Sequence, residues 1–224
     1  MAQIFPRNAN TLVKSSLVLT VVIVPILALA AVWFFTWSDW ARHVGEAYAP
    51  GQPVPYSHKI HVGGFKMQCQ YCHNRVEVSP YANVPATETC MSCHSVVLAK
   101  DPVLQPIRDS WEKNIPMQWN KVHDLPDFVY FNHSIHVAKG VGCSTCHGNV
   151  AAMGETGAWK VQGLFMGWCL NCHRNPEQFL RPKDQIYNTT WQAPENQVTI
   201  GLQLKKEYGI RTAYQLTNCA ICHR

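Results

Sequence analysis

The sequence is poor in charge. Asp, Glu, Lys and Arg make up 15% of its 224 residues, whereas 47% are hydrophobic. Soluble domains carry about 25% charged residues, so the composition excludes a disordered chain and favours a membrane protein or one densely filled with ligands. The net charge is +5, but no basic run is longer than the pair Lys205 and Lys206. The positive charges are best explained as a solvated face, and no nucleic acid partner is expected.

Charge is missing altogether from one segment near the N-terminus. Between Leu17 and Trp37 the chain is apolar apart from Thr20, Pro25 and Thr36. At about 1.5 Å per residue, a helix of this length spans roughly 30 Å, the thickness of a bilayer core. We therefore predict one transmembrane helix, in which Pro25 is tolerated beside neighbouring helices.

The flanks of this helix predict its orientation. Arg7 and Lys14 precede it, and positive flanks favour the cytoplasmic side. The N-terminus is therefore expected in the cytoplasm. A cleaved signal peptide is the alternative, since Ala28-Leu29-Ala30 resembles a cleavage site, but the apolar stretch is longer than the usual 7–15 residues. An aromatic belt is expected at the far interface, from Trp33, Trp37 and Trp40.

No cysteine lies outside one repeated motif. Cys-x-x-Cys-His occurs five times and accounts for all ten cysteines. Two thiols three positions apart can form thioethers to both vinyl groups of one porphyrin, and the adjacent histidine then supplies an axial nitrogen to the iron. Five covalently bound haem c groups are therefore predicted. The motifs, numbered in chain order, are Cys69–Cys72–His73, Cys90–Cys93–His94, Cys143–Cys146–His147, Cys169–Cys172–His173 and Cys219–Cys222–His223.

Other uses of paired cysteines fit this pattern less well. Zinc ribbons also use Cys-x-x-Cys, but they need no histidine after each pair, and five pairs do not divide into four-cysteine sites. Disulfides are disfavoured because each pair would close only a very small loop. No motif has lysine in place of histidine, a change that often marks an iron with an open position. A reductase of nitrite or a similar oxyanion is therefore disfavoured.

Four of the six remaining histidines form two similar pairs. Both pairs have the pattern aromatic-x-His-x-Ile-His-Val, and each shortly precedes a haem motif. Histidines one helical turn apart can ligate two different haems, one on each side of the turn. Surface histidines are the alternative. We predict four distal iron ligands from these pairs: His58, His61, His133 and His136.

Two residues compete to be the fifth distal ligand. His123 lies ten residues before His133. Met166 lies shortly before the fourth motif, and its thioether could reach a haem and raise the reduction potential. Both are kept as candidate metal ligands. His43 follows the apolar helix closely and is expected to be an interfacial residue.

The rest of the sequence predicts little regular structure. Beyond the apolar helix the chain is rich in Pro and Gly and poor in long periodic segments. One short helix is predicted by an apolar stripe at Val103, Leu104, Ile107 and Trp111. We expect a mostly irregular and α-helical multihaem cytochrome c with few or no strands. Residues 1–40 would form a cytoplasmic stub and the transmembrane helix, and residues 41–224 a periplasmic haem domain.

These motifs resemble known families. The F/Y-x-His-x-x-His element followed by Cys-x-x-Cys-His resembles class III multihaem cytochromes c. That resemblance implies that the first histidine of each pair ligates the following haem and the second serves a neighbouring haem. Residues 122–133 read VHDLPDFVYFNH. Together with the helix and five motifs, they make nearly the whole chain similar to the pentahaem subunit of bacterial alternative complex III, a quinol:electron-acceptor oxidoreductase.

This resemblance implies a role in electron transfer within a complex in the cytoplasmic membrane. Partner subunits, one with iron–sulfur clusters and one polytopic and quinol-binding, would oxidise quinol. The chain would pass the electrons to a small periplasmic cytochrome c or a terminal oxidase, and no catalysis is expected of the isolated chain. The alternative is a membrane-anchored multihaem quinol dehydrogenase of the NapC/NirT type, a family that lacks paired His-x-x-His elements of this kind.

Overall fold

The computed structural model describes residues 8–37, 48–154 and 157–224. The chain divides into two compact units, residues 1–43 and residues 44–224. Three residues discussed above, Arg7, Trp40 and His43, lie outside the described residues, as do the side chains of Thr36 and Trp37.

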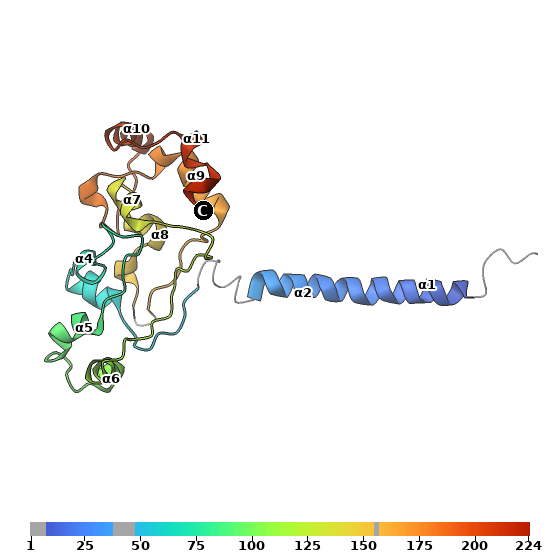
Figure 1. Ribbon diagram of the computed structural model, residues 1–224, viewed down its shortest axis with the longest axis horizontal. Coiled ribbons are helices and arrows are strands. Elements are labelled where there is room, and N and C mark those ends of the chain that lie inside the picture. Colours follow the sequence, from blue (N-terminus) through green and yellow to red (C-terminus); the bar gives the residue numbers. More distant parts are fainter. Residues whose placement is uncertain (1–7, 38–47, 155–156) are drawn as a thin grey trace, which may run out of the picture. The chain divides into compact units, whose positions relative to one another are not determined.

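The first unit contains one long helix (Figure 1). It begins as α1 (Ala9–Val18), passes through a π-helical turn, η1 (Leu19–Ile23), and continues as α2 (Val24–Trp37). The span Ala9–Phe35 has 27 residues, a mean hydropathy of 2.8 and no buried residue in its most apolar window. By length and composition it can cross a membrane. The helix begins earlier than expected because polar residues before Leu17 continue its hydrogen-bond ladder, starting with Leu12 N–H to Asn8 O at 2.9 Å.

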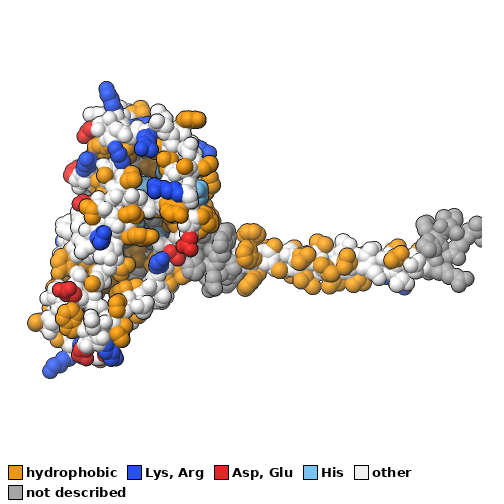
Figure 2. Space-filling model, in the orientation of Figure 1, with side chains coloured by type: hydrophobic (Ala, Val, Ile, Leu, Met, Phe, Trp, Pro, Cys, Tyr) orange, Lys and Arg blue, Asp and Glu red, His pale blue; other side chains and the backbone are white. Residues whose placement is uncertain are grey.

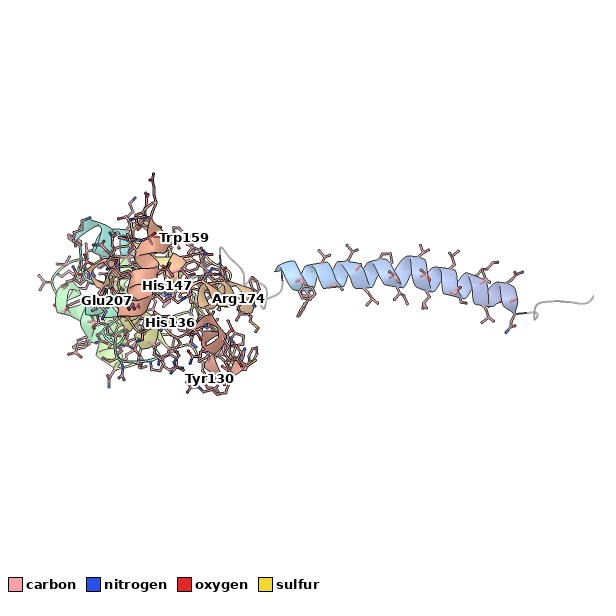
Figure 3. All side chains as sticks on the ribbon, turned by 90° about the horizontal axis from the view of Figure 1, so that it is seen from above. Tyr130, His136, His147, Trp159, Arg174 and Glu207 are labelled. Atoms are coloured by element: carbon pink, nitrogen blue, oxygen red, sulfur yellow. The ribbon has the colours of Figure 1, made fainter. Side chains whose placement is uncertain are left out.

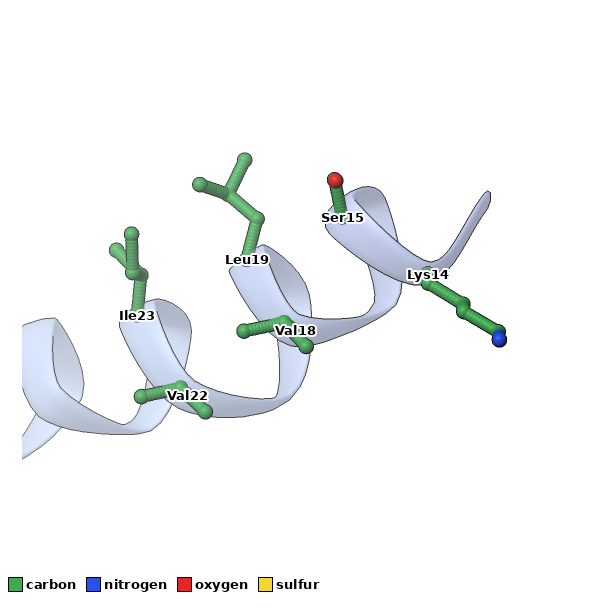
Figure 4. Close-up of a pocket in the computed structure, with 6 residues that line it drawn as sticks. All are labelled: Lys14, Ser15, Val18, Leu19, Val22 and Ile23. Carbon is green, nitrogen blue, oxygen red and sulfur yellow. The ribbon is translucent and has the colours of Figure 1, made fainter. Parts of the chain in front are cut away.

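The π-helical turn lies directly before Pro25. Proline has no amide hydrogen, and its ring collides with the carbonyl group four residues earlier, which here lies within η1. A wider turn relieves this collision, so the helix continues through the proline. Side chains around this turn line a shallow groove on the open surface of the helix (Figure 4): Lys14, Ser15, Val18, Leu19, Val22 and Ile23.

The second unit consists of short helices joined by irregular chain (Figure 1). Its described residues form no strand, and one isolated β-bridge pairs Val141 with Leu180. The predicted fold class is confirmed. The main helices are η2 (Lys59–Gly64), α4 (Cys69–Cys72), α5 (Thr87–His94), η3 (Pro102–Leu104), α6 (Gln105–Lys113), α7 (His133–Ala138), α8 (Cys143–His147), η4 (Val150–Ala152), α9 (Met166–Arg174), η5 (Pro176–Gln178), η6 (Lys183–Gln185), α10 (Gln197–Glu207), α11 (Ala213–Leu216) and η7 (Cys219–Ile221).

The apolar core of this unit is small and dispersed. Figure 2 shows hydrophobic side chains scattered among charged ones on its visible face. Leu104 and Ile107, from the predicted apolar stripe, are buried at η3 and α6 and pack with Val54. Such a core suits a domain whose interior is shared with large apolar cofactors. The buried hydrophobic residues of the described chain are Val54, Val76, Leu104, Ile107, Met153, Leu180, Ile186 and Leu204.

Each of the two histidine-bearing helices packs near the haem motif that follows the other: η2 near the third motif, and α7 near the first. η2, which carries His61, packs on η4, and Lys59 N–H donates to Met153 O at 2.8 Å. Reciprocally, the first residue of α7 contacts the segment that follows the first motif, where His133 N–H donates to Pro80 O at 3.2 Å. Residues after the first motif therefore support α7, and residues after the third motif support η2.

Candidate haem-binding sites

All five motifs lie on short helical segments, α4, α5, α8, α9 and η7, and all ten cysteines are unpaired. In four motifs the Nδ1–H of the histidine donates to a backbone carbonyl oxygen. Because a carbonyl oxygen can only accept, Nδ1 carries the proton and Nε2 keeps its lone pair. This is the arrangement that metal-ligating histidines adopt. The bonds run from His73 to Asn83 (2.6 Å), His94 to Val97 (3.0 Å), His173 to Leu216 (2.9 Å) and His223 to Phe128 (2.9 Å).

Three of the four predicted distal histidines also donate from Nδ1 to a backbone carbonyl oxygen. His61 donates from Nδ1 to Ser57 O at 2.9 Å, and His136 donates to Asn132 O at 2.7 Å, each reaching back one turn. His133 donates to Pro80 O at 2.7 Å. His58 differs, because its Nδ1 is buried without a hydrogen-bond partner.

Three of these imidazoles face a motif histidine at a constant separation. Ring centroids are 6.1 Å apart for His61 and His94, 6.4 Å for His133 and His147, and 6.2 Å for His136 and His173. Two metal–nitrogen bonds of about 2 Å, plus the distance from each nitrogen to its ring centre, place two axial imidazoles ~6.3 Å apart. These separations therefore fit one iron between each pair. Figure 3 labels His136, on α7, and His147, at the end of α8, within the second unit.

An aromatic ring holds each histidine pair in the same way. Tyr56 stacks on His61 at 4.6 Å and meets His58 edge-on at 4.9 Å. Phe131 stacks on His136 at 4.5 Å and meets His133 edge-on at 4.8 Å. The sequence repeat is therefore also a structural repeat, and the aromatic residue of the pattern orients both imidazoles.

Comparisons with known proteins agree with this geometry. Residues 129–224, which contain the second histidine pair and the last three motifs, match the family of cytochrome c7 and related cytochrome c. The chain is also 32% identical, over 148 residues, to the multihaem cytochrome c subunit of menaquinone reductase from Nitratidesulfovibrio vulgaris. That match covers 55% of this chain and 68% of the relative. The chain belongs to the multihaem c-type cytochromes. Covalently bound haem c and electron transfer follow from this membership.

The two candidates for the fifth distal ligand lie in different settings within this cytochrome. The ring of His123 is 4.3 Å from that of His147, too close for an iron between them. His133 faces His147 at the correct distance, so His123 is a neighbour of that site. Its Nε2 is buried without a partner, and burial lowers the pKa of His123 to about 4. Met166 is 61% exposed at the start of α9.

A buried lysine that the motifs did not predict lies near this site. Lys160 is 1% exposed, and its Nζ has no hydrogen-bond partner, although it lies 5.5 Å from the centre of the Tyr48 ring. Burial lowers the pKa of Lys160, and its charge in turn lowers that of His123. The charge of Asp124 acts against the lowering at Lys160, but no group is hydrogen-bonded to the buried ammonium group. Burial of an ammonium group without a directly bonded counter-charge is costly. A haem propionate would supply that charge, so the residues present fit a haem here.

Arg181 is a second residue without a sequence signal. It is almost fully buried. Its guanidinium group donates hydrogen bonds to Ser144 Oγ at 3.2 Å and to Thr145 Oγ1 at 2.9 Å, both in the third motif. Ser144 and Thr145 are the two residues between the cysteines of that motif. Arg181 therefore positions α8.

The buried thiols also suit thioether formation. Burial raises the pKa of Cys146 to about 12 and those of Cys143 and Cys172 to about 11. A free thiolate is disfavoured at these positions because water is excluded. A thioether carries no charge, so the same burial does not oppose it.

Proposed function

We propose that this cytochrome passes electrons through five covalently bound haems, from quinol oxidised in partner subunits to a periplasmic cytochrome or terminal oxidase. The main support is the three pairs of imidazole rings whose centres are separated by the distance that one iron between them requires. An iron with two protein ligands and four porphyrin nitrogens has no open position for a substrate. Such haems exchange electrons only, which supports an electron-transfer role.

The proposed iron ligands follow from the geometry and the motifs. His73, His94, His147, His173 and His223 would be the proximal ligands. His61, His133 and His136 would be the distal ligands opposite His94, His147 and His173. His58 would face His73, because His58 is the first histidine of its pair, as His133, which faces His147, is the first of the other pair. Each haem would be attached through the two cysteines of its motif.

The apolar helix supports membrane attachment. We place the N-terminus in the cytoplasm and the haem unit in the periplasm, since Arg7 and Lys14 flank the first end of the helix. The stretch from Leu17 to Trp37 contains no ionisable side chain that could accept a quinol proton. Quinol chemistry would therefore belong to an iron–sulfur subunit and a polytopic subunit, as in alternative complex III.

A second candidate reverses the direction of flow. The relative is named as a subunit of a menaquinone reductase. In a complex of that kind, electrons would enter from a soluble donor and leave toward the quinone. Electrons can pass along a chain of haems in either direction. The reduction potentials of the partner subunits would therefore determine the direction of electron flow.

Copurification in a mild detergent followed by mass spectrometry tests the assignment. We expect an iron–sulfur subunit and a polytopic membrane subunit with the cytochrome. Assays of the purified complex, with menaquinol plus an oxidised cytochrome and with menaquinone plus a reduced donor, would identify the direction. If the cytochrome purifies alone and oxidises quinol at the full rate of membranes, the proposal fails and a NapC/NirT-type quinol dehydrogenase is supported.

A further inference from the structure

The order of the motifs in space differs from their order in the chain. The first and second motifs are neighbours, because Tyr71 and Ser92, the central residues of the two, share a hydrogen bond of 3.0 Å between their hydroxyl groups. His58 and His61 lie one turn apart, and His61 faces His94 of the second motif. One short helical segment would thus serve both sites, with His61 at the second motif and His58 at the first.

The first and third motifs are also linked, through the segments that follow them. η2 precedes the first motif, and its Lys59 N–H donates to Met153 O, which follows the third motif. α7 precedes the third motif, and its His133 N–H donates to Pro80 O, which follows the first motif. A second bridge is made by residues 186 and 187, where Ile186 O accepts from Cys143 N–H at 3.0 Å and the Tyr187 hydroxyl donates to Glu77 at 2.6 Å. This bridge ties the third motif to the segment that follows the first.

The third, fourth and fifth motifs follow in line. α7 supplies His133 opposite His147 and His136 opposite His173, so it joins the third and fourth sites. α9, which carries the fourth motif, packs on α11, and Nδ1–H of His173 donates to Leu216 O in α11. α11 leads directly into the fifth motif on η7.

The second and fifth motifs each contact one further segment, α6 and residues 128–130 respectively, and neither segment contains Cys or His. α5, with the second motif, packs on α6, which contains neither Cys nor His. At the fifth motif, His223 and Cys222 bond to Phe128 and Tyr130 of an irregular segment. Of the ten cysteines, the exposed ones are Cys93 and Cys219, one in each of these motifs. In Figure 1, α5, α4, α8 and α9 follow one another from one end of the unit toward the other.

We infer that the haems are wired in the order second, first, third, fourth, fifth motif, so that electrons enter and leave at the second and fifth. This inference rests on the proposed function, because it names where that function's partners dock. Each hop oxidises one iron and reduces the next, and no atom or proton is transferred. In this order, the haems of the first and second motifs connect to those of the third and fourth through the first and third motifs.

Redox titration of two matched variants of the full-length cytochrome tests this order. A methionine ligand raises the potential of its haem, and a haem whose potential changes shifts those of adjacent haems through their charges. We expect His61→Met, at the second motif, to raise one midpoint potential and shift one neighbour. The control, His136→Met at the fourth motif, should raise one and shift two. Two shifted neighbours for His61→Met would overturn the order, since they place the second motif inside the wire.

Nuclear Overhauser contacts between haem substituents, in the unaltered and fully reduced protein, give an independent readout. We expect contacts between the haems of the first and third motifs and none between those of the second and third. Contacts between the second and third would overturn the order. Neither measurement involves a partner protein, so the wiring can fail while the proposed complex stands, and the reverse.

Discussion

At the scale of single residues, the hydrogen bond on Nδ1 decides what a histidine of this cytochrome can do. The Cys-x-x-Cys-His spacing identifies the proximal residues, but it says nothing of the tautomer. Carbonyl groups from distant parts of the chain, such as Phe128 O at His223, hold Nε2 free for iron. A residue with no motif, Lys160, lowers the pKa of His123, because burial strengthens the effect of its charge.

Replacing Lys160 should lower one reduction potential. A buried positive charge favours the reduced, less positive haem, so Lys160→Met should shift the midpoint potential of the haem beside His147 downward. Redox titration followed by optical absorption measures this. Lys113→Met is the control, since Lys113 forms an exposed ion pair with Asp109 at 3.3 Å. Equal potentials in the two variants would contradict a role for Lys160 at a haem.

Replacing each of the two candidates for the fifth distal ligand should show which of them, if either, ligates an iron. We expect His123→Ala to produce a high-spin signal from one haem in electron paramagnetic resonance, because the Nε2 of His123 is buried and unpartnered. Met166→Leu should leave every haem low-spin, since Met166 is largely exposed. The reverse pattern would identify Met166 as the ligand, and a low-spin spectrum in both variants would exclude both residues.

At the scale of elements, close backbone approach joins the two repeats. A Cβ on Gly63 of η2 would lie 2.5 Å from Ala151 O in η4, so glycine alone fits at this crossing. The predicted apolar stripe did form helical structure, in which Leu104 and Ile107 pack on the apolar Val54. Its other two residues, Val103 and Trp111, are exposed. Neither the crossing of η2 and η4 nor the support of α7 by Pro80 has a counterpart in local periodicity.

Gly63→Ala should therefore destabilise the haem unit. Forcing the two backbones apart costs about 1–3 kcal/mol, the range for overpacked interiors. Thermal unfolding of the holoprotein, followed by circular dichroism, should show a lower midpoint. Gly51→Ala is the matched control, because a Cβ there meets nothing within 4 Å. An unchanged midpoint for Gly63→Ala would mean that η2 and η4 separate without cost.

At the scale of the whole molecule, cofactors take the place of a continuous apolar core. Few side chains are buried in the described haem unit, and the buried ones are dispersed around the motifs. Apolar macrocycles held between imidazole pairs would account for most of the packing between the short helices. The fold of this unit is therefore coupled to haem attachment.

The purified chain should carry five haems. A pyridine haemochrome assay against protein concentration should give a ratio of five, and intact-mass spectrometry should show the same number of added haem groups. In a Cys219→Ala, Cys222→Ala double variant the ratio should fall to four, because the other four motifs keep both of their cysteines. A ratio below five in the unaltered protein would contradict the assignment of all five motifs.

Spacing along the chain is enough to identify the cofactor class, the two histidine pairs and the long apolar helix, and to predict the proximal ligands. Each of these depends on neighbours within about one helical turn, and local geometry imposes it. The facing of His61 and His94, the facing of His136 and His173, and the place of His123 beside His147 depend on tertiary packing. They arise because the two repeats cross through η2, η4 and α7, and contacts between residues far apart in sequence leave no period in it.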